Sequence, residues 1–472
     1  MGDERGGETA EVAEVTVPES RGGRRRVTPL VATAALLTTV GWGLHHWWAD
    51  LADREVTNLE FIVLAAFVSL VYTNLLPYLQ RDARATPGRR RLMRRHERIL
   101  TIVPAHNEDP AMFTAMLDSL LRQTVRPAVL HVVENGNPGY TPTLGSLVDA
   151  WVARHSPPFT VRYSFNPVGD KRLAQVVALR ACPDATIHMT LDSDVELGDE
   201  RVIESGVESF ADRRVMSVCG LLLGVNQRRR ILTRLIDLGF VGSFLNGRAA
   251  YSLVNSVSVN TGGLAFYRAS VMNRYVDHYL GHRIFGRRMS YGDDAMWTRY
   301  ALLEGRAVFQ RSAWGYTLHP ENWKHLVAQR TRWHRSWFWG NLWLIRNFSP
   351  RRVVWWLTLY QLTSFVWFTA AIPLVVVVAP LVTGQVAWLF IAWAALVSYL
   401  TSLPYLTVRR PDMRLREQVV NWSLAPLAAG LNMYIGWALR YAGMVTCLRT
   451  GWGTREHVEV GRPVAPAGEL TS

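Results

Sequence analysis

The stretch MTLDSD, Met189–Asp194, joins a β-strand pattern to two carboxylates and guides the interpretation of the rest of the chain. The apolar and β-branched residues up to Leu191 predict a buried strand, and Asp192 and Asp194 follow where that strand ends. Two carboxylates at a strand end can converge on one site, and hard oxygen ligands suit Mg²⁺ or Mn²⁺. A solvated acidic turn is the alternative, because further acidic residues follow.

The surroundings of this stretch, residues 97–348, alternate short β-branched runs with helical patterns. The runs are Ile99–Val103, Val129–Val133, Thr186–Leu191 and Val215–Leu223. Such alternation predicts an α/β sheet with mostly parallel strands, in which ligands bind at strand ends. The stretch Arg228–Tyr251 mixes arginines with apolar residues. It predicts either a helix on a membrane surface or an ordinary amphipathic helix.

Composition narrows the class of protein. The 472 residues carry a formal net charge of +14, and 49% are hydrophobic. Arginine clusters beside apolar segments favour a membrane partner over nucleic acid. The three cysteines have no CxxC spacing, which argues against a disulfide framework or a cysteine zinc site. Lys171 and Lys324 are the only lysines, so these positions indicate a need for a compact ammonium rather than a planar guanidinium.

The N-terminal region predicts membrane helices. Residues 1–27 have the composition of a disordered tail. Two apolar stretches within residues 28–80 each approach the roughly 20 residues that cross a bilayer, so we expect two transmembrane helices. A cleaved signal peptide is the alternative for the first of them. Residues 81–95 then carry seven arginines, which predicts that the tail and the following domain are cytoplasmic.

A second apolar region occupies residues 349–448. No charged residue occurs between Val353 and Val408, a length that predicts two spans. The stretch Val419–Cys447 adds one or two more, which gives three to four helices in all. Residues 449–472 are expected to form a cytoplasmic tail.

Two more motifs carry polar residues at predicted element ends. In IVPAHNE, Ile102–Glu108, a strand runs into a polar turn, which is either a ligand-binding strand end or only a turn. In YGDD, Tyr291–Asp294, two carboxylates precede a helical pattern. Asp294 is a candidate general base, and a helix N-cap is the alternative role.

A further motif, QRTRW, covers residues 329–333. On a helix, Gln329, Arg332 and Trp333 share one face. The arginine could neutralise a leaving diphosphate, and the tryptophan could stack on a sugar. A juxtamembrane aromatic and basic anchor is the alternative.

In this order and between two apolar blocks, the motifs resemble the processive family 2 glycosyltransferases, which include hyaluronan, chitin and cellulose synthases. The resemblance covers roughly Arg98 to Arg455. The segments NTGGLAFYR at 260–268, GDD at 292–294 and WGTR at 452–455 are closest to hyaluronan synthases. The resemblance implies an α/β GT-A-type glycosyltransferase domain, residues 81–348, inserted between N- and C-terminal transmembrane helices.

The resemblance also implies roles for particular residues. Asp192 and Asp194 would hold the nucleotide diphosphate through Mg²⁺ or Mn²⁺, Asp194 more directly. Asp294, with Asp293 beside it, would be catalytic. The remaining nucleotide-sugar residues would be Pro104, Asn107, Glu108, Glu134 and Lys171, and the acceptor and diphosphate residues Gly262, Gly263, Gln329, Arg332 and Trp333. Glu134 stands where the family has an acidic turn that binds uracil, and Asn135 is the alternative contact.

The implied activity is inverting transfer from a UDP-sugar to a growing polysaccharide at the cytoplasmic face of the cell membrane, with coupled export. Its partners would be the UDP-sugar, the glycan and the lipid bilayer, and not nucleic acid. Two alternatives stay open: a non-processive transferase that acts on a lipid-linked acceptor, and a non-catalytic transporter or scaffold that keeps a degenerate transferase fold.

Overall fold

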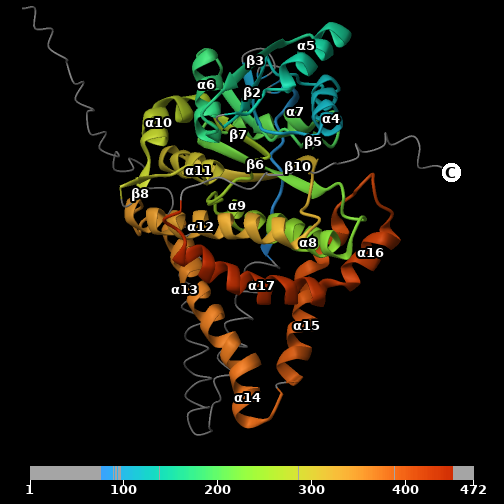
Figure 1. Ribbon diagram of the computed structural model, residues 1–472, viewed down its shortest axis with the longest axis vertical. Coiled ribbons are helices and arrows are strands. Elements are labelled where there is room, and N and C mark those ends of the chain that lie inside the picture. The colour runs from blue at the N-terminus through green and yellow to red at the C-terminus, as the bar shows by residue number, and fades with distance from the viewer. Residues whose placement is uncertain are drawn as a thin grey trace, which may run out of the picture.

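An eight-stranded sheet in the order β3-β2-β1-β4-β7-β6-β10-β5 organises the protein (Figure 1). The computed structural model describes residues 76–449, except 89, 91–92, 94–96, 138, 285 and 387. The strands of the sheet are β1 Ile99–Ala105, β2 Val129–Asn135, β3 Thr160–Asn166, β4 Ile187–Leu191, β5 Glu196–Leu197, β6 Val215–Gly224, β7 Leu264–Arg268 and β10 Arg306–Thr317. A separate two-stranded ribbon pairs β8 Arg283–Ile284 with β9 Arg287–Arg288.

The sheet is mixed. Strands β3, β2, β1 and β4 run parallel, and β6 runs parallel to β10. Strand β7 is antiparallel to both β4 and β6, and β5 is antiparallel to β10. The prediction of an α/β sheet is confirmed, with four parallel and three antiparallel pairings. The sequence patterns did not reveal β3, β5, β7 or β10.

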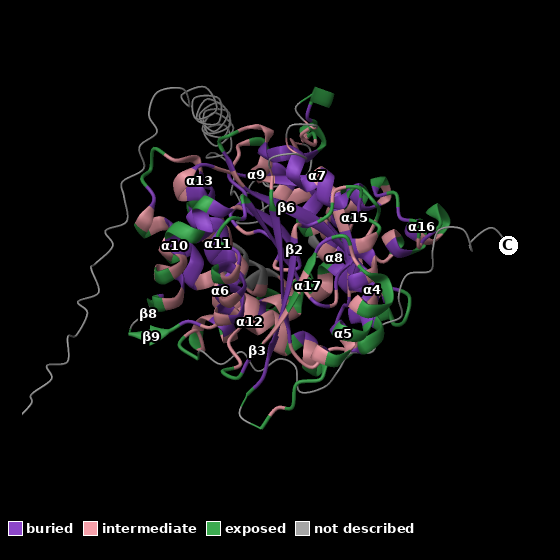
Figure 2. Cartoon of the chain, turned by 90° about the horizontal axis from the view of Figure 1, so that it is seen from above, coloured by how far each residue is buried: buried purple, intermediate pink, exposed green. Residues whose placement is uncertain are grey.

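Helices cover both faces of the sheet, so its central strands are buried (Figure 2). Ile99 and Val103 of β1 enter one core, and Leu100 and Ile102 enter the other, as the period-2 alternation of a strand requires. The first core also takes side chains from α4 Pro110–Leu121, α5 Leu144–His155 and α7 Val202–Glu208. The second takes them from α6 Lys171–Ala181, α10 Ala269–Gly281 and α11 Asp293–Glu304.

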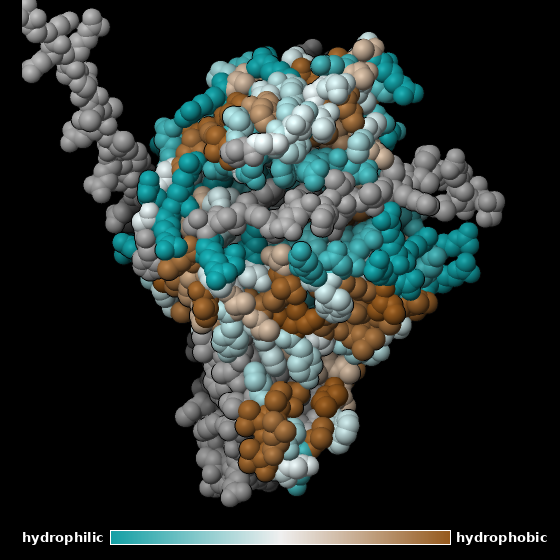
Figure 3. Space-filling model, viewed as in Figure 1, coloured by the Kyte–Doolittle hydropathy of each residue, from teal (hydrophilic) through white to brown (hydrophobic). Residues whose placement is uncertain are grey.

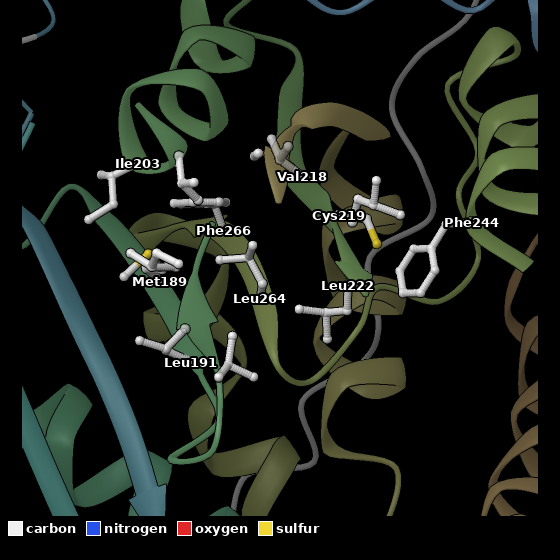
Figure 4. Close-up of a cluster of buried hydrophobic side chains, with 14 of the residues drawn as sticks. Met189, Leu191, Ile203, Val218, Cys219, Leu222, Phe244, Leu264 and Phe266 are labelled. Atoms are coloured by element: carbon white, nitrogen blue, oxygen red, sulfur yellow. The ribbon is translucent and has the colours of Figure 1, made fainter. Parts of the chain in front are cut away.

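The strand that precedes Asp192 lies in the middle of the first core. Met189 and Leu191 of β4 lie beside Leu264 and Phe266 of β7, and side chains of β6 complete the cluster (Figure 4). Each of these four residues has no measurable exposure. This packing holds β4 in place and so fixes where the chain turns into the Asp-x-Asp segment.

A layer of helices lies beneath the sheet (Figure 1). It contains α8 Ile231–Gly242, the π-helical turn η4 Ser243–Arg248, α9 Ala249–Leu253 and α12 Trp323–Asn347. The predicted helical stretch 228–251 is helical from Ile231 onward, with a π-helical turn inside it. The C-terminal elements follow as α13 Val353–Pro373, η5 Leu374–Val378, α14 Ala379–Thr383, α15 Trp388–Ser402, η6 Leu403–Thr407, α16 Leu415–Ser423 and α17 Ala425–Val445.

The helices α13 to α15 form a hairpin that points away from the sheet (Figure 1). The turn falls at Gly384, where φ is 69°. Across the part of the chain that the structure describes, no single helix is both long and apolar enough to cross a membrane. Residues 28–75 of the predicted N-terminal spans, the tail 1–27, and residues 450–472 with the WGTR motif lie outside the described residues.

Candidate active site

A cavity of about 440 Å³ lies between the carboxyl ends of β1 and β4 and one face of α12. The predicted site residues converge on it from motifs far apart in the sequence. Those that line it are Pro104, Glu108, Lys171, Asp192, Asp194, Gly262, Gly263, Asp293, Asp294, Gln329, Arg332 and Trp333. The sequence motifs therefore belong to one site.

The turn after β1 and the Asp-x-Asp turn after β4 are tied together by Glu108. Its Oε1 accepts hydrogen bonds from the Ser193 hydroxyl at 2.6 Å and from the backbone N–H of His106 at 3.2 Å. Parallel pairing of β1 with β4 brings the two turns to the same edge of the sheet. Glu108 thus orients the segment that carries Asp192 and Asp194.

Lys171 occupies the centre of the acidic side of the cavity. It starts α6, and its Nζ lies 2.8 Å from Oδ1 of Asp192 and 3.4 Å from Oδ2 of Asp293. Burial alone would lower the pKa of Lys171, but Asp192 and Asp293 outweigh that effect and hold the pKa above its usual value. Lys171 therefore stays charged and joins β4 to α11.

Asp293 and Asp294 occupy the first turn of α11. Gly292, at φ 70°, occupies the N-cap position, so Asp294 is not the N-cap residue. Asp293 accepts a hydrogen bond of 2.9 Å from Nε2 of Gln175 and lies close to Lys171. These two polar partners fix Asp293 as a buried charge.

The carboxyl groups of Asp293 and Asp294 have different pKa values because their surroundings differ. Burial, together with the charge of Asp293, raises the pKa of Asp294 to about 6. Burial also acts to raise the pKa of Asp293, but Lys171 and Arg172 outweigh it and lower the pKa. Paired acids whose environments separate their pKa values are typical of acid–base sites. Asp294 is the one suited to accept a proton near neutral pH.

Gly262 and Gly263 leave room beside these groups. A methyl group at Gly263 would lie 2.8 Å from Cδ1 of Leu222 and 3.4 Å from Oδ2 of Asp192. A methyl group at Gly262 would lie 3.6 Å from Nζ of Lys171 and 3.7 Å from Oδ2 of Asp294, inside the cavity. Gly263 is therefore required by packing, whereas Gly262 keeps space for a ligand.

The opposite wall is α12. Gln329, Arg332 and Trp333 all line the cavity, and all three lie within α12, where their spacing puts them on one face of the helix. The Trp333 ring is stacked on Phe240 of α8, with centroids 6.2 Å apart and planes 23° apart. The Arg330 guanidinium lies 4.7 Å from the centre of the Trp333 ring. Trp333 is thus held between two neighbours and presents a planar apolar surface.

Two predicted residues do not line the cavity. Glu134 is fully buried, and its oxygens accept hydrogen bonds from the hydroxyls of Tyr140 and Tyr163 and from two backbone N–H groups. Asn107 has φ 52°, and its N–H donates to Tyr140. In this structure both residues shape the turns next to the site, while Asn135 lines the cavity.

Other lining residues had no sequence signal. They include Phe240, Arg248, Arg299 and His319. They lie in helices or after strands with no motif around them, and only the packing of α8, η4 and α11 brings them to the cavity.

A second cavity, of about 430 Å³, adjoins the first. The lining residues that the two share include Arg248, Arg299, His334 and Trp337. Arg440 of α17 and aromatic side chains of α13 complete its wall. The second cavity therefore leads from the first cavity toward the C-terminal helices.

The donor set fits a divalent cation that takes most of its ligands from a substrate. Within the described residues, no group of three or more His, Cys, Asp or Glu side chains is arranged around one point. Asp192 and Asp194 both line the cavity. Mg²⁺ is commonly held by one or two carboxylates plus substrate phosphates, so this pair is sufficient only with a phosphate ligand present.

Comparison with known proteins agrees with this geometry. Residues 189–403 match the family described as glycosyl transferase family group 2. Hyaluronan synthase from Streptococcus pyogenes is 27% identical over 366 residues, which are 77% of this chain and 84% of that protein. An N-acetylglucosaminyltransferase from Neorhizobium galegae is 28% identical over 60% of this chain and 65% of its own length.

A solved structure supports the fold. The mannosyltransferase PcManGT from Pyrobaculum calidifontis, in complex with GDP-Man and Mn²⁺, superposes with a TM-score of 0.51 at 19% identity. The match covers 78% of this chain and 97% of that one. The α/β fold is thus GT-A-like. The chain contains a family 2 glycosyltransferase domain, and it is a glycosyltransferase homologous to the hyaluronan synthases.

Proposed function

We propose that the protein is a membrane-embedded, inverting glycosyltransferase that elongates a polysaccharide from a UDP-sugar. One observation carries the proposal: Asp294, with its raised pKa, faces the same cavity as the Asp192–Lys171 pair and the Gln329, Arg332 and Trp333 face of α12. A candidate base, a candidate diphosphate site and a candidate acceptor-binding surface therefore line the same cavity.

In the proposed reaction, Asp294 takes the proton of an acceptor hydroxyl. The oxygen of that hydroxyl attacks the anomeric carbon as the bond to the diphosphate breaks, which inverts the configuration. Lys171 and Arg332 neutralise the negative charge that grows on the leaving diphosphate. Asp293 stays ionised beside Lys171 and keeps Asp294 basic.

Asp192 and Asp194 are the residues proposed to hold Mg²⁺ or Mn²⁺. When bound, the cation would neutralise part of the diphosphate charge. PcManGT was solved with GDP-Man and Mn²⁺. This supports a divalent cation in a fold of this kind, although the nucleotide differs from the UDP proposed here.

The second cavity supports a polymeric and negatively charged product. Its lining carries the guanidinium groups of Arg248, Arg299 and Arg440, and none of its described lining residues is acidic. Arg299 is only 4% exposed, and its Nε has no hydrogen-bond partner. A buried cation needs an anionic partner, and aromatic side chains such as Trp337 suit sugar rings. We therefore propose that a glycan bearing carboxylates passes through this cavity.

The C-terminal helices support membrane embedding. Large apolar side chains are exposed along the α13–α15 hairpin, with Leu381 at 81%, Val382 at 78% and Trp388 at 71%. Apolar surface gathers on the hairpin and on the helical layer above it, while the sheet domain is mostly hydrophilic (Figure 3). Contiguous exposed apolar surface of this kind is typical of a protein or membrane contact, and we assign it to lipid. Arginines near these segments support a cytoplasmic catalytic domain.

The test uses the full chain in membranes or detergent with Mn²⁺. UDP-sugars are supplied singly and in pairs, with and without a uronic acid sugar, and UDP release, product size and product charge are measured. We expect a long polymer that binds an anion exchanger. A single-sugar glycolipid would instead support the lipid-linked alternative, and no UDP release with any sugar would reject the proposed substrate.

A further inference from the structure

The carboxylate of Asp237 on α8 is fully buried and joins three parts of the protein. Its Oδ1 accepts a hydrogen bond of 2.8 Å from the backbone N–H of Gly224 and lies 3.2 Å from Nε2 of His319. Its Oδ2 accepts hydrogen bonds of 2.6 Å from Arg410 and 2.9 Å from the Tyr405 hydroxyl. Gly224 ends β6, His319 follows β10, and the last two residues belong to the C-terminal helical region.

Arg410 completes the cluster. Its side chain is fully buried, and it donates to Asp237, to both oxygens of Asp412 and to the carbonyl of Gly224. Tyr316 of β10 donates a hydrogen bond of 2.8 Å to Asp412. Burial alone would raise the pKa of Asp237, but Arg410 and His319 outweigh it and hold the pKa below its usual value. Both buried charges are therefore paired and hydrogen-bonded, as burial in a low dielectric requires.

The cluster reaches the catalytic cavity through two rings. The His319 imidazole meets the Phe240 ring edge to face, with centroids 5.2 Å apart. Phe240 lies one helical turn after Asp237 on α8 and is stacked on Trp333. His319, Phe240 and Trp333 all line the cavity. A change at Asp237 would therefore be transmitted to the apolar wall that faces the acceptor.

The same cluster fixes α8 against the C-terminal helices. Nδ2 of Asn421 in α16 lies 3.3 Å from the Tyr405 hydroxyl, which itself binds Asp237. A methyl group at Gly239 of α8 would lie 2.5 Å from Nδ2 of Asn432 in α17, so these two helices approach closely. The position of the cavity wall thus depends on the position of the C-terminal helices.

We infer that Asp237 and Arg410 are positioning residues that act through His319 and Phe240. They keep Trp333 in a fixed position relative to the C-terminal helices and so align the acceptor end of the glycan with Asp294. This inference rests on the proposed function. On the nucleotide-sugar side of the site, Lys171 binds Asp192 and Asp293 rather than a member of this cluster. Loss of the cluster should therefore impair transfer and elongation while nucleotide-sugar binding persists.

The experiment compares Asp237→Asn, Arg410→Lys and Phe240→Leu with the wild type, per mole of folded full-length protein. Asparagine keeps the shape of Asp237 but cannot accept hydrogen bonds at both of its terminal side-chain atoms. Lysine keeps the charge of Arg410 but lacks the planar guanidinium that binds two partners at once. Readouts are the KM for the UDP-sugar, UDP release by hydrolysis without acceptor extension, and product length.

The expected result is a split between these readouts. For Asp237→Asn and Phe240→Leu, transfer falls by about tenfold or more and products shorten, because small misplacements of reacting groups are costly. The KM for the UDP-sugar and the rate of hydrolysis stay within about twofold of the wild-type values, because only the acceptor wall of the cavity shifts. Arg410→Lys is intermediate. Asp277→Asn, which removes a carboxylate from the exposed Arg180–Asp277 ion pair, is the matched control and should behave like the wild type.

Two outcomes overturn the inference. One is an equal loss of hydrolysis and transfer, which would mark the cluster as structural only. The other is unchanged transfer and product length in Asp237→Asn. If Asp237→Asn does not fold, Phe240→Leu decides between the same outcomes, because it removes no charge. If the wild type itself releases no UDP from any sugar, the proposed function fails and this inference fails with it.

Discussion

Lys171 donates a hydrogen bond of 2.8 Å to Oδ1 of Asp192, and this contact joins the first turn of α6 to the end of β4. Because the same ammonium lies 3.4 Å from Asp293, it also sets the electrostatics of the carboxyl pair at the start of α11. The acidic half of the cavity is therefore organised around one of the two lysines in the chain.

Replacement of Lys171 by arginine should abolish transferase activity, although arginine keeps the positive charge. Nζ of Lys171 has Gly262, Asp192 and Asp293 around it, and a planar fork has no room to meet both carboxylates. Lys324→Arg is the matched control, because Lys324 is exposed at the start of α12. The measurement is UDP release by each variant, and equal loss in both would contradict the assigned role.

Lys171→Met should also destabilise the fold. Asp293, whose side chain is only 7% exposed, would then keep a buried charge without its lysine partner. The loss of one partner from a buried ion pair costs about 3–5 kcal/mol. Thermal or denaturant unfolding of the catalytic domain would measure this loss. An unchanged unfolding midpoint would show that Asp192 and Asp293 gain other partners.

The rate should depend on pH through Asp294. Its pKa of about 6 means that the basic form predominates above that pH, so kcat/KM should rise about tenfold per pH unit up to about pH 6 and then level off. Asp294→Asn should lower kcat by about 10²–10⁴-fold and remove this limb of the profile. A pH profile that is the same in both proteins would assign the proton to another group.

The same substitution should increase stability at neutral pH. Since the folded pKa of Asp294 is raised, the protonated acid favours the folded state, and this contribution is lost as pH rises from about 4 to about 6. Asp294→Asn avoids a buried charge, so its unfolding temperature should exceed that of the wild type at pH 8 and approach it near pH 4. The reverse order at pH 8 would contradict the raised pKa.

The two neighbouring glycines should respond differently to alanine. Gly263→Ala places a methyl group 2.8 Å from Leu222 and 3.1 Å from Val195, so we expect a loss of about 1–3 kcal/mol of stability and a shift of Asp192. Gly262→Ala meets no atom closer than 3.6 Å and should keep its stability while its KM rises. Equal unfolding midpoints for the two variants would contradict this distinction.

The elements with strong local patterns were predictable from sequence. Strands β1 and β4 are buried on both faces and are mostly apolar or β-branched, so the strands before the IVPAHNE and Asp-x-Asp turns were evident. The 3.6-residue repeat of a helix was enough to place Gln329, Arg332 and Trp333 on one face. In contrast, β3 has an exposed and irregular pattern, so it gave no clear signal.

The order and spacing of residues along the chain specify the chemistry of the site: an acidic pair at a strand end, a second acidic pair at a helix start, and a Gln-Arg-Trp helix face. Three relationships come from packing alone. Lys171 joins the two acidic pairs, Glu134 is engaged in buried hydrogen bonds, and Asp237 ties the Trp333 wall to the C-terminal helices. The physical reason is the separation along the chain of the groups that produce each effect. Local propensity and periodicity follow from neighbours in the chain, whereas a charge's partners and pKa depend on groups that only packing brings within a few ångströms.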